Sequence, residues 1–192
     1  MVNVLDKVQP KTKEQLKQLI NYAFKHDIYD LNFIDTSKIT DMYELFPSVA
    51  HNFNVSGWDV SKVKNMNYIF YNCKNFNCDL SNWNVLNVTD MHSMFAMCEN
   101  FKGKGIENWD VSNVIDMFNM FDRCTNFNCD LSSWDVSKVK DMSFMFNQCK
   151  AFEGKGLEQW NVSNVEDFRE MFYKCGKVTI PSWYKYPSWY KY

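Results

Sequence analysis

One line of sequence recurs along this chain, and its period constrains the fold more than any other feature. The frame reads W-[DN]-V-S-x-V-x-[DN]-M-x-x-M-F-x-x-C-x-x-F, with a complete copy from Trp134 to Phe152. Its tryptophan stands at positions 58, 83, 109, 134 and 160, so successive copies are alternately 25 and 26 residues apart. A fixed period of this length is typical of an array in which each repeat stacks on the next.

Two periodicities alternate within each repeat. One half carries apolar residues at i, i+3, i+4 and i+7, the spacing of two helical turns with one inward face. In the copy after Trp58 these residues are Met66, Ile69, Phe70 and Cys73. The other half alternates like a strand, as in Phe76, Cys78 and Leu80. We therefore predict an α/β repeat solenoid, leucine-rich-repeat-like, with one short helix and one short extended strand per 25–26-residue repeat.

An acidic or amide residue precedes each helix-like half, where it is placed to act as an N-cap. These residues are Asp41, Asn65, Asp90, Asp116, Asp141 and Asp167. A cation-binding strip is the alternative, but capping accounts for every member without an ion. The repeats with glycine after the second Phe, as at Gly103 and Gly105, are one residue longer, and we expect a bulge there because glycine tolerates a positive φ.

The segment before the repeats has a helical pattern of its own. Thr12 and Gln15 match a capping box, and apolar residues then follow at helical spacing from Leu16 to Phe24. We predict an amphipathic helix from Lys13 to Lys25 that covers the apolar end of the first repeat.

Three regions follow from these patterns. Residues 1–33 form the capping helix and first strand, residues 34–180 form a solenoid of about six repeats, and residues 181–192 form an aromatic tail. The tail duplicates the hexamer Pro-Ser-Trp-Tyr-Lys-Tyr. We expect Trp183 of the first copy to fold over the last repeat, whereas the second copy has no repeat left to cover.

The seven cysteines do not predict a metal site. Five of them occupy one position of the repeat, which predicts a ladder of buried, reduced thiols. A zinc site built from Cys73, Cys78, Cys124 and Cys129 would need four sulfurs at one point, yet the two pairs lie two repeats apart. The three histidines show no ligand spacing, and nucleophile, P-loop and dinucleotide motifs do not occur. We expect neither metal nor cofactor, and we do not expect an enzyme.

The variable positions after the Met carry the remaining functional signal. We select Tyr68, His92, Phe118, Phe144 and Arg169 as candidate partner-binding residues. Exposed aromatic side chains often anchor protein interfaces. In the alternative, the rings tuck back onto the neighbouring repeat, and the sequence does not decide between the two.

Charge and hydropathy exclude some partners. A net charge of −2 offers no electrostatic attraction to nucleic acid, and no apolar run is long enough for membrane insertion. The first seven residues do not resemble a secretory signal, so we expect a cytoplasmic location.

The repeat line, entered through Asp30-Leu31-Asn32-Phe33-Ile34-Asp35-Thr36-Ser37, resembles the BspA-like surface-protein repeat. Similar repeats occur in mycoplasma-type lipoproteins and Listeria-type surface proteins. The resemblance implies a bacterial leucine-rich-repeat variant at the cell surface or secreted, acting in adhesion to host matrix proteins or other cells, without catalysis. Our leading hypothesis is a non-catalytic scaffold for protein–protein interaction. The alternative is an architectural, self-assembling array, and we expect a monomer or weak self-association.

Overall fold

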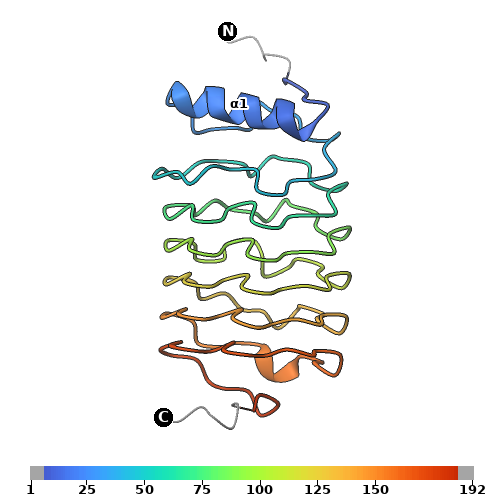
Figure 1. Ribbon diagram of the computed structural model, residues 1–192, viewed down its shortest axis with the longest axis vertical. Coiled ribbons are helices and arrows are strands. Elements are labelled where there is room, and N and C mark those ends of the chain that lie inside the picture. The colour runs from blue at the N-terminus through green and yellow to red at the C-terminus, as the bar shows by residue number, and fades with distance from the viewer. Residues whose placement is uncertain (1–6, 186–192) are drawn as a thin grey trace.

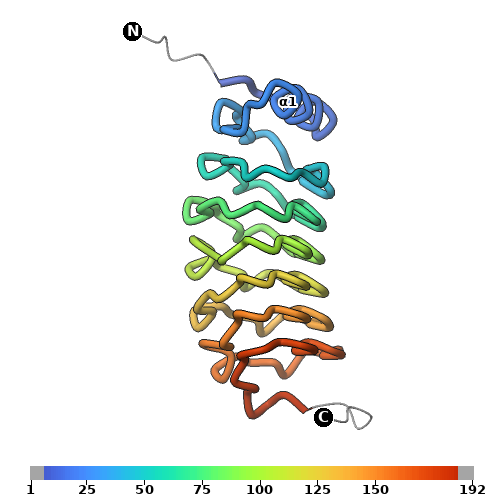
Figure 2. Tube along the Cα trace, turned by 90° about the vertical axis from the view of Figure 1, so that its left-hand side faces the viewer, coloured from blue at the N-terminus to red at the C-terminus, as the bar shows by residue number. Residues whose placement is uncertain are grey.

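The computed structural model describes residues 7–185 and shows a stack of flat coils, one for each sequence repeat (Figure 1). Helix α1 (Lys13–Lys25) lies across one end of the stack, and a single turn of 3-10 helix, η1 (Leu157–Gln159), lies near the other. A view from the side shows the coils following one another along a single axis (Figure 2). Each coil therefore contacts mainly the coil before it and the coil after it.

Helix α1 confirms the predicted amphipathic helix. The hydroxyl of Thr12 accepts a hydrogen bond from Gln15 N at 3.3 Å, and Gln15 Oε1 accepts one from Lys11 N at 2.7 Å. The reciprocal bond of this capping box thus reaches one residue further back than usual. Leu16 and Ile20 are fully buried, so the apolar face of α1 covers the first coil.

The predicted helix in each repeat is wrong. Between residues 26 and 156 of the described chain there is no helix, and the helix-like half is a run of tight turns. Ile69 N donates to Met66 O at 3.2 Å, and Cys73 N donates to Phe70 O at 3.0 Å. A further turn starts at Tyr68, whose O accepts from Tyr71 N at 3.1 Å, and the successive turns direct the same side chains inward as a helix would. The spacing of apolar residues alone cannot separate the two structures.

Hydrogen bonds between coils explain why turns form instead of a helix. Tyr68 and Asn72 have φ values of 57° and 59°, in the left-handed region. This conformation turns alternate N–H groups toward the next coil: Tyr68 N donates to His92 O at 3.0 Å and Asn72 N to Ala96 O at 2.8 Å. In a helix these N–H groups would bond within the segment and leave the coils unjoined. The left-handed residues cost about 1–2 kcal/mol each, which burial and hydrogen bonding between the coils must offset.

The predicted strand in each repeat is also wrong. Residues 7–185 contain isolated parallel bridges but no continuous strand. The longest series joins one residue per coil: Asp41, Asn65, Asp90, Asp116, Asp141 and Asp167. In the half expected to be extended, Trp83 N bonds back to Leu80 O at 3.0 Å and Val88 N to Val85 O at 2.9 Å. Because these turns close every few residues, pairing between coils never continues long enough to form a strand. The fold is a turn-rich stack, not an α/β leucine-rich-repeat solenoid.

The core consists of aromatic columns that run through the stack. The ring of Phe121 lies 5.6 Å from Phe95 and 5.7 Å from Phe146, centroid to centroid. A second column uses the tryptophans, whose indole N–H donates to a carbonyl of the preceding coil, as in Trp134 to Ile106 O at 2.9 Å. Trp183 makes the same bond to Leu157 O at 2.8 Å, so it lies over the last coil. The second hexamer copy lies outside the described residues.

Five of the seven cysteines form a third column: Cys73, Cys98, Cys124, Cys149 and Cys175. All seven are free, and all except Cys175 are buried. Cys98 Sγ donates to Phe70 O at 3.0 Å, and Cys124 Sγ donates to Phe95 O at 2.9 Å. Burial raises the pKa of both thiols well above its ordinary value, so they stay protonated and act as small hydrogen-bonding core residues. The predicted burial of the ladder is confirmed for Cys73, Cys98, Cys124 and Cys149, whereas Cys175 is partly exposed.

Candidate functional site

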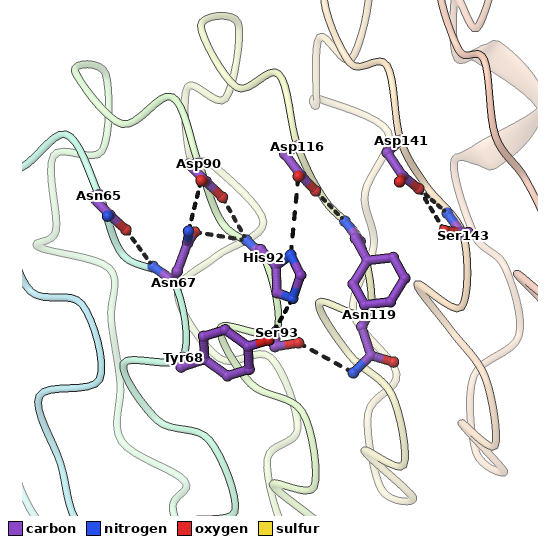
Figure 3. A network of polar contacts seen from close by, with 11 residues as sticks. Asn65, Asn67, Tyr68, Asp90, His92, Ser93, Asp116, Asn119, Asp141 and Ser143 are labelled. Atoms are coloured by element: carbon purple, nitrogen blue, oxygen red, sulfur yellow. Dashed lines mark hydrogen bonds and ion pairs between the residues drawn. The ribbon is translucent and has the colours of Figure 1, made fainter.

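The candidate site lies on the flank of the stack where each run of turns begins (Figure 3). Asp116 Oδ1 accepts a hydrogen bond from Phe118 N at 2.8 Å, and Asp90 Oδ1 accepts one from His92 N at 3.1 Å. This bond, two residues ahead, fixes a local turn. The acidic column therefore starts runs of turns, and the predicted role as helix N-caps is wrong because no helix follows.

His92 links neighbouring coils on this flank. Its Nε2 lies 2.7 Å from the hydroxyl of Tyr68 on the preceding coil, within hydrogen-bonding distance. Its Nδ1 lies 4.0 Å from Asp116 Oδ2 on the following coil (Figure 3). Asn67 Nδ2 donates to Asp90 Oδ2 at 2.6 Å and extends the polar contacts toward the N-terminal end. These side chains hold three coils in register at the surface.

Five rings form a continuous row along the same flank, which we call the aromatic strip. The members are Tyr43, Tyr68, His92, Phe118 and Phe144. Successive ring centroids are 6.1, 4.9, 4.6 and 5.9 Å apart. Tyr43 is exposed and the other four are partly exposed. Each ring thus packs on its neighbour and still presents surface to solvent, so packing onto the neighbouring coil does not bury the rings.

The structure brings together four of the five residues selected from the sequence. Arg169 is exposed on the coil after Phe144, where its Nη2 pairs with Asp167 Oδ2 at 2.7 Å. Tyr43 belongs to the strip but was missed by sequence reasoning. It follows Met42 directly, as His92 follows Met91, so the register of the degenerate first repeat could have revealed it.

The charges along the strip are unevenly neutralised. At its two ends, Lys13 pairs with Asp41 at 2.9 Å and Arg169 pairs with Asp167. Between them, within residues 7–185, Asp90 and Asp116 form no ion pair with lysine or arginine. Burial raises the pKa of Asp116, and the neighbouring charges of Asp90 and Asp141 raise it further, against the hydrogen bond from Phe118 N. The middle of the strip therefore carries uncompensated negative charge.

A buried polar pair lies a few residues further along the coils, where sequence reasoning expected nothing. Asn147 Nδ2 donates to Asp122 Oδ1 at 2.7 Å, and Arg123 Nε lies 3.6 Å from Asp122 Oδ2. Burial raises the pKa of Asp122 to about 6, despite the opposing effects of Arg123 and Asn147. Asn147 Oδ1 has no hydrogen-bond partner among residues 7–185. The equivalent residue one repeat earlier is Ala96, so the repeat pattern gives no sign of this pair.

Replacing Asp122 by Asn is expected to stabilise the protein at pH 8 by up to about 2 kcal/mol and to lose this advantage as the pH falls toward 4. The folded protein holds the Asp122 proton up to about pH 6, whereas the unfolded chain releases it near its ordinary pKa. Stability therefore falls as the pH rises from the ordinary pKa of 3.8 to about 6, where only the unfolded chain has released the proton, and it stays at the lower value above pH 6. Urea unfolding of both proteins at several pH values measures the difference.

Asp110→Asn is the matched control for this experiment. Asp110 is exposed, and hydrogen bonds from Ser112 lower the pKa of its carboxyl. Its replacement should give no stabilisation at pH 8. An Asp122→Asn variant with the same pH profile as the unmodified protein would contradict the assignment of a raised pKa.

The described residues contain no group of three or more His, Cys, Asp or Glu side chains placed to hold a metal ion. Nor does any helix among residues 7–185 have the length and apolar character needed to cross a bilayer.

The fold and the strip define the chain as a turn-rich repeat protein with an aromatic flank. Its sequence matches the family described as "Mycoplasma protein of unknown function, DUF285" over residues 14–104 and 89–185. Because these two matches cover most of the chain, the protein belongs to this family. No curated protein and no solved structure matches the chain.

Proposed function

We propose that the protein is a non-catalytic scaffold for protein–protein interaction and that the aromatic strip is its contact surface. The contiguity of the strip supports this most directly: five rings on five successive coils touch one another and remain partly exposed. The buried columns of Phe and Trp already form the core. The strip is therefore additional aromatic surface, and it faces solvent. Partly buried aromatic side chains are common anchors of protein interfaces.

Adhesion is the form of binding that the repeat line favours. Its resemblance to BspA-like surface repeats supports a host matrix protein or a cell-surface protein as the partner. Such a role places the protein at the cell surface or in a secreted form. The ladder of free cysteines is equally compatible with the alternative cytoplasmic location, where thiols stay reduced.

A double variant, Phe118→Ala with Phe144→Ala, tests the proposal. We expect its binding to immobilised matrix proteins and to whole cells to fall about tenfold or more, since two anchors are removed. The matched control is Leu86→Ala with Ile115→Ala, which removes two exposed apolar side chains outside the strip. Equal binding by the two double variants would refute the strip as the contact surface, provided that both unfold at the same urea concentration as the unmodified protein.

A second candidate function is an architectural array that assembles with copies of itself. The backbone N–H groups at the end of the stack opposite α1 favour it. In each earlier coil, alternate N–H groups bond to the next coil, as Phe144 N does to Arg169 O at 2.8 Å. In the last coil the equivalent groups of Phe168, Glu170, Phe172 and Lys174 have no acceptor among residues 7–185. A row of N–H donors that lack an acceptor in the described part of the chain is an edge that another chain can pair with. Light scattering across a concentration series measures this, and a strict monomer at high concentration would refute it.

A further inference from the structure

The chain already binds one of its own lysines on the aromatic strip. Lys13, at the start of α1, places its ammonium 2.9 Å from Asp41 Oδ2 and 5.2 Å from the centroid of the Tyr43 ring. The two residues flank Met42, one on each side. An ammonium held by a carboxylate and an aromatic ring gains from both the charge pair and the cation–π contact.

The same pair of side chains recurs at Asp116 and Phe118, which flank Met117. In both coils the first carboxylate oxygen is used locally: Asp41 Oδ1 accepts from Tyr43 N at 2.9 Å and Asp116 Oδ1 accepts from Phe118 N at 2.8 Å. The second oxygen is therefore the one that can take a cation. Asp41 Oδ2 takes Lys13, whereas Asp116 Oδ2 has no hydrogen-bond donor within residues 7–185.

The surroundings of Asp116 do not supply the missing cation. The nearest ionisable group of opposite sign is His92, whose Nδ1 lies 4.0 Å away and whose Nε2 lies against the Tyr68 hydroxyl. Asp90 on the preceding coil and Asp141 on the following coil add like charge. Phe118 contacts His92 at 4.6 Å and Phe144 at 5.9 Å between ring centroids, so aromatic surface continues on both sides of the pair.

We propose that Asp116 and Phe118 bind a lysine or arginine side chain of a protein partner, in the way that Asp41 and Tyr43 bind Lys13. This inference rests on the proposed function and names the partner's chemistry: a basic segment that lies along the strip. Complementary charge would strengthen the encounter and fix its register. Binding should weaken with salt, because a partly exposed charge pair is screened.

The test uses the peptide acetyl-(Lys-Gly)4-amide as the probe and the same peptide with every lysine Nε-acetylated as its neutral counterpart. Amide chemical shifts of the full chain report binding and its location at low ionic strength. We expect the lysine peptide to shift the Phe118 amide and the acetylated peptide to leave it unchanged. Asp116→Asn keeps a side-chain oxygen that can accept the hydrogen bond of the turn. This variant should lower the affinity for the lysine peptide about five- to tenfold.

Two further variants sharpen the result. Asp110→Asn removes an exposed carboxylate of the same coil and is the matched control. Like Asp116, Asp110 accepts a hydrogen bond from the backbone N–H two residues later, from Ser112 N at 3.1 Å. This variant should bind the lysine peptide as the unmodified protein does. Lys13→Met vacates the first pair, and the lysine peptide should then also shift the Tyr43 amide. Equal binding of the two peptides, equal affinity for the Asp116→Asn variant, or absence of binding would each overturn the inference.

The outcomes separate this inference from the proposed function. If the Phe118→Ala/Phe144→Ala variant loses the partner but the lysine peptide does not bind, the strip is a contact surface for a partner of different chemistry, and the basic segment is refuted. If that double variant also keeps the partner, the proposed function is refuted as well.

Discussion

Replacing Phe121 by Ala is expected to lower the free energy of unfolding by about 3–5 kcal/mol. The ring is fully buried in the middle of the stack. It lies 4.1 Å from Phe127, and it contacts Phe95 and Phe146 on the coils before and after it. Truncation removes buried apolar surface and leaves a cavity that three stacked rings cannot fill without moving whole coils.

The architecture explains why one ring has so large an effect. A coil of a repeat stack contacts only its neighbours, so its stability depends on the two interfaces it makes. Phe121 contributes to both. Phe118 lies three residues earlier on the same coil, but its ring is partly exposed on the aromatic strip. Its replacement by Ala should cost less than about 1.5 kcal/mol, since less surface is uncovered.

Urea denaturation of the two single variants gives this comparison directly. The Phe121→Ala protein should unfold at a clearly lower urea concentration, and a second, earlier transition would show that the stack separates into two parts at the damaged coil. Similar losses for Phe118→Ala and Phe121→Ala would contradict the division between a buried column that stabilises and a flank that binds.

The sequence predicts which side chains face inward, but not the backbone that carries them. Met66, Ile69, Phe70 and Cys73 are all fully buried, as their spacing predicts. The same spacing arises from consecutive turns of four residues. Left-handed residues would have distinguished the turns, but Tyr68 and Phe144 adopt that conformation without being glycine or asparagine. Hydrogen bonds between coils select it, and these depend on neighbours 23–26 residues away rather than on local propensity.

The site follows from the sequence to a similar extent. Reading the variable positions after Met in register finds Tyr68, His92, Phe118 and Phe144. Arg169 lies outside the strip, and its pairing with Asp167 depends on side-chain geometry that the pattern does not show. The same reading misses Asp122, since a single buried carboxylate follows no period. The repeat pattern shows which residues form columns. The structural role of a residue that differs from the rest of its column is visible only in the structure.

Replacing Gly105 by Ala is the second substitution expected to have a large effect, with a loss of about 2–4 kcal/mol in the free energy of unfolding. Gly105 belongs to the longer form of the repeat, and its φ is +90°, which confirms the predicted positive φ. A Cβ at this position would lie 2.2 Å from Ser81 N and 2.8 Å from Leu80 C. Both atoms are backbone of the preceding coil, so no side-chain rotation can make room.

The contact that Gly105 allows also joins two coils. Leu80 N donates to Lys104 O at 3.1 Å, one residue before the glycine, and separating the backbones would lengthen this bond. Alanine therefore adds conformational strain at residue 105 and weakens the adjoining hydrogen bond. The longer repeat depends on glycine because the two backbones meet there, in addition to its tolerance of a positive φ.

Gly176→Ala is the control for Gly105→Ala. A Cβ on Gly176 would meet Lys150 O at 3.2 Å, and its φ lies outside the left-handed region. We expect a change below about 1 kcal/mol, because a few tenths of an ångström of adjustment relieves the contact. Thermal unfolding of the two variants measures the difference. If Gly105→Ala were as stable as Gly176→Ala, the backbones at Ser81 and Gly105 could separate without cost, and the close contact could not be the reason that the longer repeat depends on glycine.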